Sequence, residues 1–348
     1  MLFEDEQALR YTRGVMQIAP LEFAATSEEA GQRLDRVIVQ HCRELSRTRV
    51  QELVREGLVL LNGKPAKDSH KVRANDVIRV VPQLRPPLRA EAEAIPLEVL
   101  YEDEDVLAVN KPAGMNVHAG AGNSHGTLVN ALLGRGQSLA HSEDPLRPGI
   151  VHRLDKETSG IVLVAKNDFA QSKLSEAFRR REIHKVYVAL VHGDMPGEKG
   201  RIELPIARDP VRRTRMTTRR AMPAPNARAA RTDWRVLARI DGATLLEIQL
   251  HTGRTHQIRV HLSALRHPVV GDTLYGAPQQ LRAGSTTLPP LGRNFLHAAQ
   301  IGFAQPHTGR TIELSAALPH ELTQYLARLC AATGENQGRI DAALKAFL

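Results

Sequence analysis

The sequence is poor in cysteine, in aromatic residues and in long apolar runs. Its two cysteines, Cys42 and Cys330, are far apart in the 348 residues, and aromatic residues make up 4%. Two cysteines cannot form a disulfide framework or a cysteine-based zinc site. No apolar run reaches the ~18–20 residues of a membrane span, and the first 20 residues do not resemble a signal peptide. We therefore expect a cytoplasmic protein without membrane contact.

Lysine is also scarce, although the chain is strongly basic. There are 10 lysines and 37 arginines against 38 acidic residues, which gives a net charge of +9. Arginine makes planar, bidentate contacts with phosphate and stacks on bases, which favours a nucleic-acid partner. A genome rich in GC codons would give the same composition, so composition alone leaves both explanations open.

The charge is unevenly distributed and indicates a domain organisation. Residues 1–30 carry a net −4, residues 31–83 a net +5, residues 84–105 a net −5 and residues 208–231 a net +7. A chain of this length typically forms two domains, and three prolines between residues 82 and 89 favour a boundary there. The predicted parts are a mobile tail (1–25), a small basic domain (26–83), a linker (84–95), a larger domain (96–330) and a C-terminal extension (331–348).

The small domain has the pattern of a compact RNA-binding module. Apolar spacing predicts helices over residues 31–42 and 46–56, and Asn62-Gly63 predicts a hairpin before a closing strand at 76–81. The segments RLD at 33–35, SRTR at 46–49 and GLVLLNGK at 57–64 resemble the S4 RNA-binding domain. This resemblance implies RNA contacts, for which the candidates are Arg47, Arg49 and Lys64.

Two segments of the larger domain concentrate polar side chains. GIVHRLDKETSG at 149–160 precedes an apolar strand at 161–165, and it sets Asp155 among cations, where a carboxylate is ionised and nucleophilic. A salt-bridged loop without catalysis is the alternative. LHTGRTHQIRVHL at 250–262 holds three histidines at spacings that match no common metal motif, so we expect a basic cleft wall and no metal.

In the order of the chain, these two segments and KVYVALV at 185–191 resemble three signature motifs of the RluA-type pseudouridine synthases. NKPAG at 110–114, GDTLYG at 271–276 and LHA at 296–298 extend the resemblance over about residues 96–318. It implies an α+β fold with a mixed, largely antiparallel central sheet and flanking helices, preceded by the S4-like domain. It also implies an isomerase that detaches uracil, rotates it and reattaches it through C5, with no cofactor.

The resemblance also implies roles for individual residues. Asp155 would be the catalytic carboxylate, Tyr187 would pack on the base, and Arg259 would pair with Asp155. Further candidates for substrate or RNA binding are Arg153, His152, Arg254, Ile161 and Leu262, the last two as the apolar floor.

Residues 118–133 are most similar to the members of the family that modify the intersubunit stem-loop, helix 69, of 23S rRNA. We therefore expect 23S rRNA or a pre-50S particle as the partner of a monomeric enzyme. The alternatives are another rRNA or tRNA site, or a non-catalytic ribosome-assembly factor.

The basic segment 208–231 separates the second and third motifs. It holds eight arginines, three prolines and no hydrophobic period. We expect a loop or hairpin at the rim of the cleft, with Arg212, Arg213 and Arg215 as phosphate contacts, so that binding weakens with salt.

Overall fold

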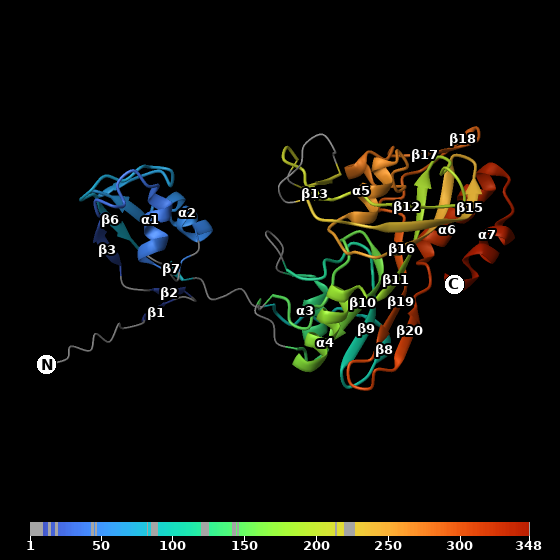
Figure 1. Cartoon of the computed structure of the whole chain (residues 1–348), viewed down its shortest axis with the longest axis horizontal. Helices are drawn as coiled ribbons and strands as arrows, with labels where there is room; N and C mark the ends of the chain where they lie inside the picture. The colour runs from blue at the N-terminus through green and yellow to red at the C-terminus, as the bar shows by residue number, and fades with distance from the viewer. Residues whose placement is uncertain are drawn as a thin grey trace. The chain divides into compact units, whose positions relative to one another are not determined.

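The computed structural model describes most of the chain, and the chain divides into two compact units, residues 1–88 and 89–348 (Figure 1). The described residues are 10–12, 15–17, 20–42, 45, 47–81, 83–84, 90–119, 125–140, 144, 146–212, 214–218 and 227–347. Several predictions fall outside them: the side chain of Arg49, Arg213, residues 85–89 of the linker, much of residues 1–19, residues 120–124 and part of the basic segment 208–231. Within the described residues, no helix is long and apolar enough to cross a membrane.

The first unit packs two short helices against a small antiparallel sheet. The helices are α1 (Leu34–His41) and α2 (Arg47–Arg55), as the apolar spacing predicts. The sheet has the order β3-β6-β4-β5, with β3 (Leu21–Ala24), β4 (Val59–Leu61), β5 (Lys64–Pro65) and β6 (Val77–Val80). Asn62 and Gly63 join β4 to β5 with positive φ angles of 50° and 74°, as a tight hairpin turn requires.

The expected tail of residues 1–25 is wrong at its C-terminal end. Strand β3 pairs with β6 from Leu21 to Ala24, and Ala25 is buried in the core of the unit. Short strands also occur earlier, where β1 (Arg10–Thr12) and β2 (Val15–Gln17) form a sheet with β7 (Gln83–Leu84). The sequence Leu21-Glu-Phe-Ala24 is only four residues long, which is too short for its alternation to stand out.

A fully buried carboxylate joins the two helices of this unit. Asp35 accepts hydrogen bonds from Nε of Arg47 at 3.0 Å, Nε2 of Gln51 at 2.8 Å, and Nε and Nη2 of Arg33, both at 3.0 Å. Burial alone would raise the pKa of Asp35, but these hydrogen bonds hold it well below its usual range. Arg47 therefore anchors α2 to α1, while about half of its side chain stays exposed.

The second unit is built on a nine-stranded sheet in the described part of the chain. Its order is β12-β15-β16-β11-β19-β10-β9-β8, with β20 added to β19. The strands are β8 (Glu98–Glu102), β9 (Val106–Lys111), β10 (Ser159–Ala165), β11 (His184–His192), β12 (Lys199–Ile202), β15 (Thr232–Ile240), β16 (Ala243–Leu250), β19 (Leu296–Ala304) and β20 (Thr311–Ser315). Only β10 and β19 are parallel among these pairs, so the predicted mixed, largely antiparallel sheet is confirmed.

Helices cover both faces of this sheet. They are α3 (Leu128–Gly134), α4 (Asp168–Arg180), α5 (Gln257–Ala264), α6 (His320–Thr333) and α7 (Gln337–Leu344), with 3-10 turns at Thr273–Tyr275 and Lys345–Phe347. Two small hairpins complete the unit, β13 (Ala207–Arg208) with β14 (Met216–Thr217) and β17 (Leu281–Ala283) with β18 (Thr286–Leu288).

Alternate residues of the central strands face two different cores. On β10, Val162 and Val164 pack in the cluster that contains α3, α6 and α7, whereas Ile161 and Leu163 pack in the cluster that contains α4. This is the period of two that a strand buried on both faces requires.

The expected C-terminal extension is not a separate part of the chain. Its proposed start at residue 331 falls inside α6, and Ile340, Leu344 and Phe347 are buried in the same core as the central strands. Residues 337–344 within the expected extension form helix α7.

Gly160 permits the close approach of β10 and β19. Its φ is +116°, and a Cβ placed there would overlap the backbone of Ala298. We expect Gly160→Ala to lower the free energy of unfolding by about 3 kcal/mol, through backbone strain and overpacking. Urea denaturation measures this change.

Gly302→Ala, on β19 of the same sheet, is the matched control. A Cβ at Gly302 would make only ordinary van der Waals contacts. The expected change is within about 1 kcal/mol. Equal effects of the two substitutions would contradict the packing argument.

Candidate active site

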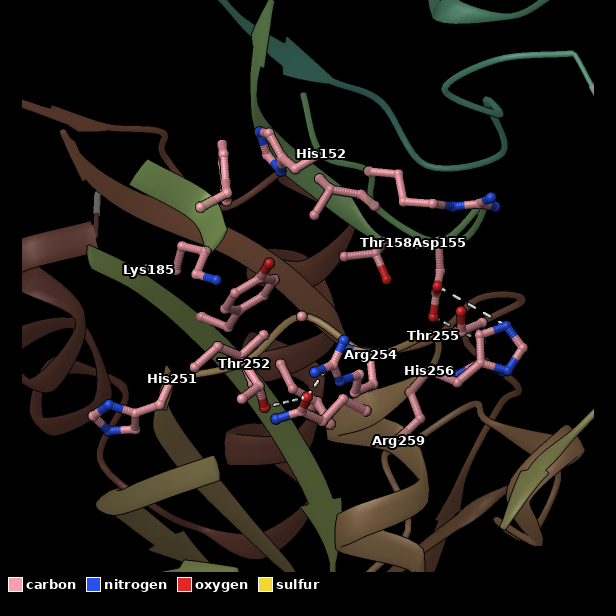
Figure 2. Close-up of a pocket in the computed structure, with 18 of the residues that line it drawn as sticks. His152, Asp155, Thr158, Lys185, His251, Thr252, Arg254, Thr255, His256 and Arg259 are labelled. Atoms are coloured by element: carbon pink, nitrogen blue, oxygen red, sulfur yellow. Dashed lines mark hydrogen bonds and ion pairs between the residues drawn. The ribbon is translucent and has the colours of Figure 1, made fainter. Parts of the chain in front are cut away.

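A cavity of about 430 Å³ opens between segments that the sequence analysis singled out (Figure 2). One side is the 151–158 loop before β10. The other side is the 250–259 segment, which runs from the end of β16 into α5. Residues of α4, β11 and β19, together with Arg181 after α4, complete the lining. The antiparallel pairing of β11 with β16 brings the second and third motifs together.

The lining of the cavity is strongly cationic. Among its described lining residues, Asp155 is the single carboxylate, and the cations are Arg153, Arg179, Arg181, Lys185, Arg254 and Arg259. A concave surface of one sign attracts ligands of the opposite sign. The cavity is therefore suited to a polyanion that brings one neutral group near Asp155.

Arg259 lies between two carboxylates at one end of the cavity. Its Nη1 donates to Oδ2 of Asp155 at 3.0 Å, and its Nε and Nη2 donate to Oδ2 and Oδ1 of Asp272 at 2.6 and 2.9 Å. Burial alone would lower the pKa of Arg259, but the two carboxylates raise it above its usual range. The expected pairing of Asp155 with Arg259 is thus present.

No role is predicted for Asp272 from the sequence. It belongs to GDTLYG, which the resemblance includes without assigning a role to its carboxylate. It is 1% exposed and holds the guanidinium of Arg259 in the bidentate geometry that favours arginine. Arg259 is consequently oriented before any ligand arrives.

Tyr187 lies on β11 in the wall of the cavity. It is 7% exposed, and the register of β11 with β19 shifts between Val186 and Tyr187. Such bulges re-aim side chains near functional sites. Burial, followed by the charge of Asp155, raises the pKa of Tyr187 above its usual value, so the hydroxyl keeps its proton at neutral pH.

His152, Phe178 and Lys185 form another part of the lining. The His152 ring stacks on Phe178 with 4.6 Å between centroids, and its Nε2 accepts a hydrogen bond from the amide of Leu163. Burial, together with the charge of Lys185, lowers the pKa of His152 to about 3, so the imidazole is neutral. Burial lowers the pKa of Lys185 to about 8.

Four lining residues were not predicted for this site from the sequence: Lys185, Phe178, Arg179 and Arg181. Their only sequence signal is the basic run at the end of α4 and the start of the KVY motif. Neither feature shows which side chains face the cavity.

The predicted apolar floor of Ile161 and Leu262 is wrong. Ile161 faces the α4 side of the sheet, and Leu262 is fully buried in the main core, so neither lines the cavity. The apolar lining instead comes from Val151, Leu154, Leu250, Ile258 and Leu296, with the aromatic Phe178. The alternation of a strand and the turn of a helix place the predicted residues on the wrong faces.

The other residues that were predicted to contact RNA lie in several different parts of the structure. Arg153 and Arg254 line the cavity, and Nε of Arg254 donates to the carbonyl of Ala229 at 3.3 Å. Arg212 is exposed in the β13–β14 hairpin, and Arg215 lies over the ring of Tyr275 at 5.2 Å. Lys64 is exposed on β5 in the first unit.

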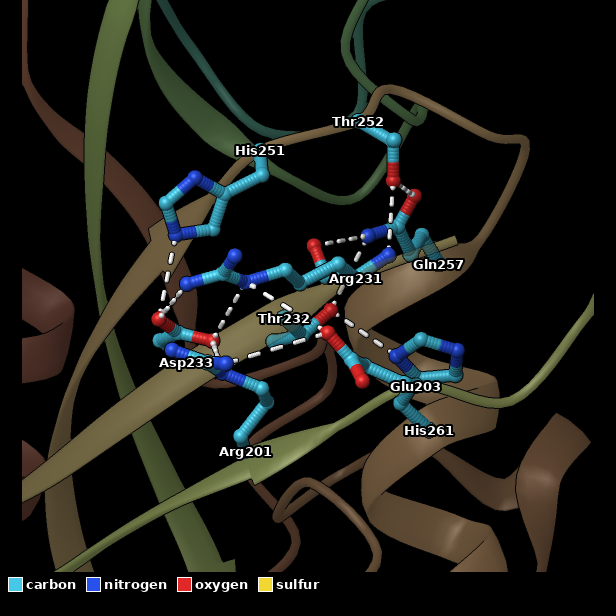
Figure 3. A network of polar contacts seen from close by, with 9 residues as sticks. All are labelled: Arg201, Glu203, Arg231, Thr232, Asp233, His251, Thr252, Gln257 and His261. Atoms are coloured by element: carbon cyan, nitrogen blue, oxygen red, sulfur yellow. Dashed lines mark hydrogen bonds and ion pairs between the residues drawn. The ribbon is translucent and has the colours of Figure 1, made fainter. Parts of the chain in front are cut away.

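A network of buried polar groups forms the outer wall of the site (Figure 3). Gln257 accepts from the Thr252 hydroxyl at 2.7 Å and donates to the carbonyl of Arg231 at 2.9 Å and to the Thr232 hydroxyl at 3.0 Å. The Thr232 hydroxyl also contacts Nδ1 of His261 at 2.8 Å. These bonds attach the start of α5 to β15.

Asp233 connects the residues at the exposed edge of this network (Figure 3). Its carboxylate accepts from Arg231 at 2.8 and 3.1 Å, from Arg201 at 3.1 Å, and contacts His251 at 3.1 Å. The hydrogen bond from Arg231 is the main cause that lowers the pKa of Asp233 to about 2. Within the described residues, no three His, Cys, Asp or Glu side chains are grouped as ligands of a metal ion.

Two family models match the chain. One, described as RNA pseudouridylate synthase, matches residues 105–264, and the S4 domain model matches residues 32–78. The site and the fold therefore define an RNA-modifying isomerase that carries an RNA-binding module.

Curated relatives and solved structures agree with these matches. The Bacillus subtilis RNA pseudouridine synthase YlyB is 38% identical over 89% of this chain and 98% of its own length. The ribosomal large subunit pseudouridine synthase D of Xanthomonas campestris is 41% identical, over 86% and 89%. Human RNA pseudouridylate synthase domain containing 1 superposes with a TM-score of 0.52 at 27% identity, covering 69% of this chain and 89% of that one. The chain belongs to the RNA pseudouridine synthase family.

Lys111, the last residue of β9, connects this strand to the loop that contains Asp155. Its side chain is fully buried, and Nζ donates to the carbonyls of Pro112, Met115 and Lys156 at 2.8, 2.9 and 3.3 Å. Burial lowers the pKa of this ammonium to about 7, and the charge of Arg293 adds to the effect. Lys156 directly follows Asp155, so Lys111 helps to fix the position of the carboxylate.

We expect Lys111→Met to lower the free energy of unfolding by about 3 kcal/mol or more. The apolar chain keeps the volume but leaves three carbonyls without their donor. Lys173→Met, at an exposed position on α4, is the control and should change stability by less than about 0.5 kcal/mol. Equal urea midpoints for the two variants would show that the three carbonyl bonds contribute nothing.

Proposed function

We propose that this pseudouridine synthase modifies uridines of 23S rRNA, in the intersubunit stem-loop helix 69, with Asp155 as its catalytic carboxylate. The observation that carries the residue assignment is the Asp155–Arg259 ion pair in a cationic cavity, with Tyr187 in the same lining. A target base inside folded RNA must leave its stack before an enzyme can act on it. The cavity volume is in the usual range for small-ligand pockets.

The reaction requires that the glycosidic N1–C1′ bond breaks, that uracil rotates, and that a C5–C1′ bond forms. The proton of C5 is lost and N1 gains one, so the atoms balance without a cofactor. Asp155 is the carboxylate that can lie at the glycosidic bond, and Arg259 keeps it in place. Tyr187 would pack on the base, and Leu154 and Ile258 would supply apolar contact.

The proposed RNA target rests on the relatives and on the first unit. Relatives named ribosomal large subunit pseudouridine synthase D match 86–93% of this chain, including one from Escherichia coli at 36% identity. The S4 domain match supports an RNA target in general, and the resemblance of residues 118–133 supports helix 69. The cations of the cavity and of the β13–β14 hairpin would neutralise phosphates.

We expect Asp155→Asn to reduce pseudouridine formation in a 23S rRNA transcript by about 10³-fold or more, because it removes the charge of the catalytic group. Primer extension after carbodiimide treatment measures the product. Glu157→Gln, two residues away and outside the cavity lining, should keep activity within a few-fold. Wild-type rates in the Asp155 variant, which should still bind RNA, would overturn the residue assignment.

The target can be tested in the rRNA of a strain that lacks this protein. We expect the pseudouridines of helix 69 to disappear and to return when the wild-type chain, but not the Asp155 variant, is supplied. Loss of pseudouridine from tRNA or from another rRNA site would replace the proposed target. Unchanged rRNA and tRNA with intact ribosome binding would favour an assembly factor.

RNA affinity should fall steeply with salt, and the β13–β14 hairpin should account for part of the slope. We expect Arg212→Gln to reduce the slope of log Kd against log salt by about 1, the value for one phosphate contact. Filter binding between 50 and 200 mM salt covers the relevant range. Arg328→Gln, at an exposed position on α6, is the control and should leave the slope unchanged.

A further inference from the structure

His256 has an unusual backbone conformation directly before α5. Its φ is +55°, in the left-handed region that a residue with a side chain rarely adopts, and its side chain makes no capping bond to the helix. Residues held in such conformations are concentrated at functional sites. The side chain is directed between Tyr275 and Asp155 instead. Nδ1 lies 2.8 Å from the Tyr275 hydroxyl. On the other side, the His256 ring faces Asp155 (Figure 2), and its Nε2 lies 3.9 Å from Oδ1 of that carboxylate.

The contacts of Tyr275 define where the protons lie. The Tyr275 hydroxyl oxygen accepts a hydrogen bond from the amide of Met216 at 2.9 Å. Within the described residues, the remaining partner of this hydroxyl is Nδ1 of His256, so its own proton is directed there. In a neutral imidazole the proton then lies on Nε2, which is the nitrogen that faces the Asp155 carboxylate.

The neutral form of His256 agrees with its surroundings. Burial lowers the pKa of His256, and although the charge of Asp155 opposes this effect, the overall shift is downward. The sequence of donors is therefore Met216 amide to Tyr275 hydroxyl, Tyr275 hydroxyl to Nδ1, and Nε2 towards Asp155. A separation of 3.9 Å is longer than a hydrogen bond, and a movement of about 1 Å would close it. Such contacts often tighten only when substrate is bound.

Tyr275 is itself held firmly. It is 2% exposed, and the guanidinium groups of Arg259 and Arg215 lie over its ring, 5.0 and 5.2 Å from the centroid. Its carbonyl accepts from the Ser263 hydroxyl of α5 at 2.7 Å. Met216 and Arg215 belong to the β13–β14 hairpin, so this hairpin is connected to Asp155 through two side chains.

We propose that Tyr275 and His256 are positioning residues, which form one hydrogen-bonded unit that orients the Asp155 carboxylate and is anchored on the β13–β14 hairpin. Arg259 holds one oxygen of the carboxylate, Oδ2, and Nε2 of His256 faces the other, Oδ1. Contacts to both oxygens fix the rotation of the carboxylate, whereas a contact to one oxygen alone does not. This inference rests on the proposed catalytic role of Asp155.

The test is a double-mutant cycle with Tyr275→Phe and His256→Asn. Tyr275→Phe removes only the hydroxyl, and asparagine tolerates the left-handed conformation at position 256. Single-turnover kinetics with a 23S rRNA fragment measures two quantities separately. They are the maximal rate and the half-saturating concentration, which is the enzyme concentration that gives half of the maximal rate. We expect each variant to lower the maximal rate by about 10- to 100-fold, as misplaced catalytic groups do, at an unchanged half-saturating concentration.

The double variant carries the decisive result. If the two side chains act as one unit, the double variant is no slower than the slower single variant. Multiplied effects would show independent roles and would overturn the inference. A general loss of stability would change the half-saturating concentration, whereas a loss of positioning would not. Tyr325→Phe is the control for the removal of a buried tyrosine hydroxyl. Tyr325 is a buried tyrosine of α6 whose hydroxyl has no hydrogen bond within the described residues, so its variant should keep the wild-type rate.

The outcomes distinguish this inference from the proposed function. An inactive Asp155→Asn together with a fully active Tyr275→Phe would overturn only the positioning unit. An active Asp155→Asn would remove the catalytic assignment itself. A raised half-saturating concentration in Tyr275→Phe at an unchanged maximal rate would show that Tyr275 contributes to RNA binding, which also contradicts the proposal.

Discussion

The guanidinium of Arg259 between two carboxylates is the interaction on which the site depends. A buried cation with a single partner is costly, and a second carboxylate with additional hydrogen bonds offsets that cost. Asp272 uses two of the nitrogens and leaves Nη1 for Asp155. The position of Asp155 is thereby defined from a residue 104 positions later in the chain.

The sheet explains how such distant residues meet. Strands β11 and β16 pair along seven residues, and β19 joins β11 to β10, so the loop before β10 and the start of α5 open onto one cavity. Two buried features keep the loop in place. Gly160 lets β10 approach β19 closely, and Lys111 donates to the carbonyl next to Asp155. The network of Gln257 and Thr232 holds the opposite wall.

Much of this arrangement could be predicted from the sequence, because some signals are local. The Asn62-Gly63 turn, the apolar spacing of α1 and the motifs around Asp155, Tyr187 and Arg259 are contiguous in the chain. The predictions that failed concern the face of an element on which a side chain lies, and contacts between residues that are far apart in the sequence. Ile161 was assigned to the cavity although strand alternation turns it to the other face, and strand β3 depends on pairing with residues more than fifty positions away. Lys185 differs from other lysines only through its surroundings in the fold.

Because Asp272 accepts two hydrogen bonds from Arg259, the site tolerates the loss of Asp155 better than the loss of Arg259. If Asp155 is lost, Arg259 is still held by both oxygens of Asp272, and the cationic lining persists. If Arg259 is lost, two carboxylates share a site without their cation. If Asp155 is the catalytic carboxylate, as proposed above, a substitution at position 155 would remove that group while the pair of Arg259 with Asp272 and the cationic lining remain.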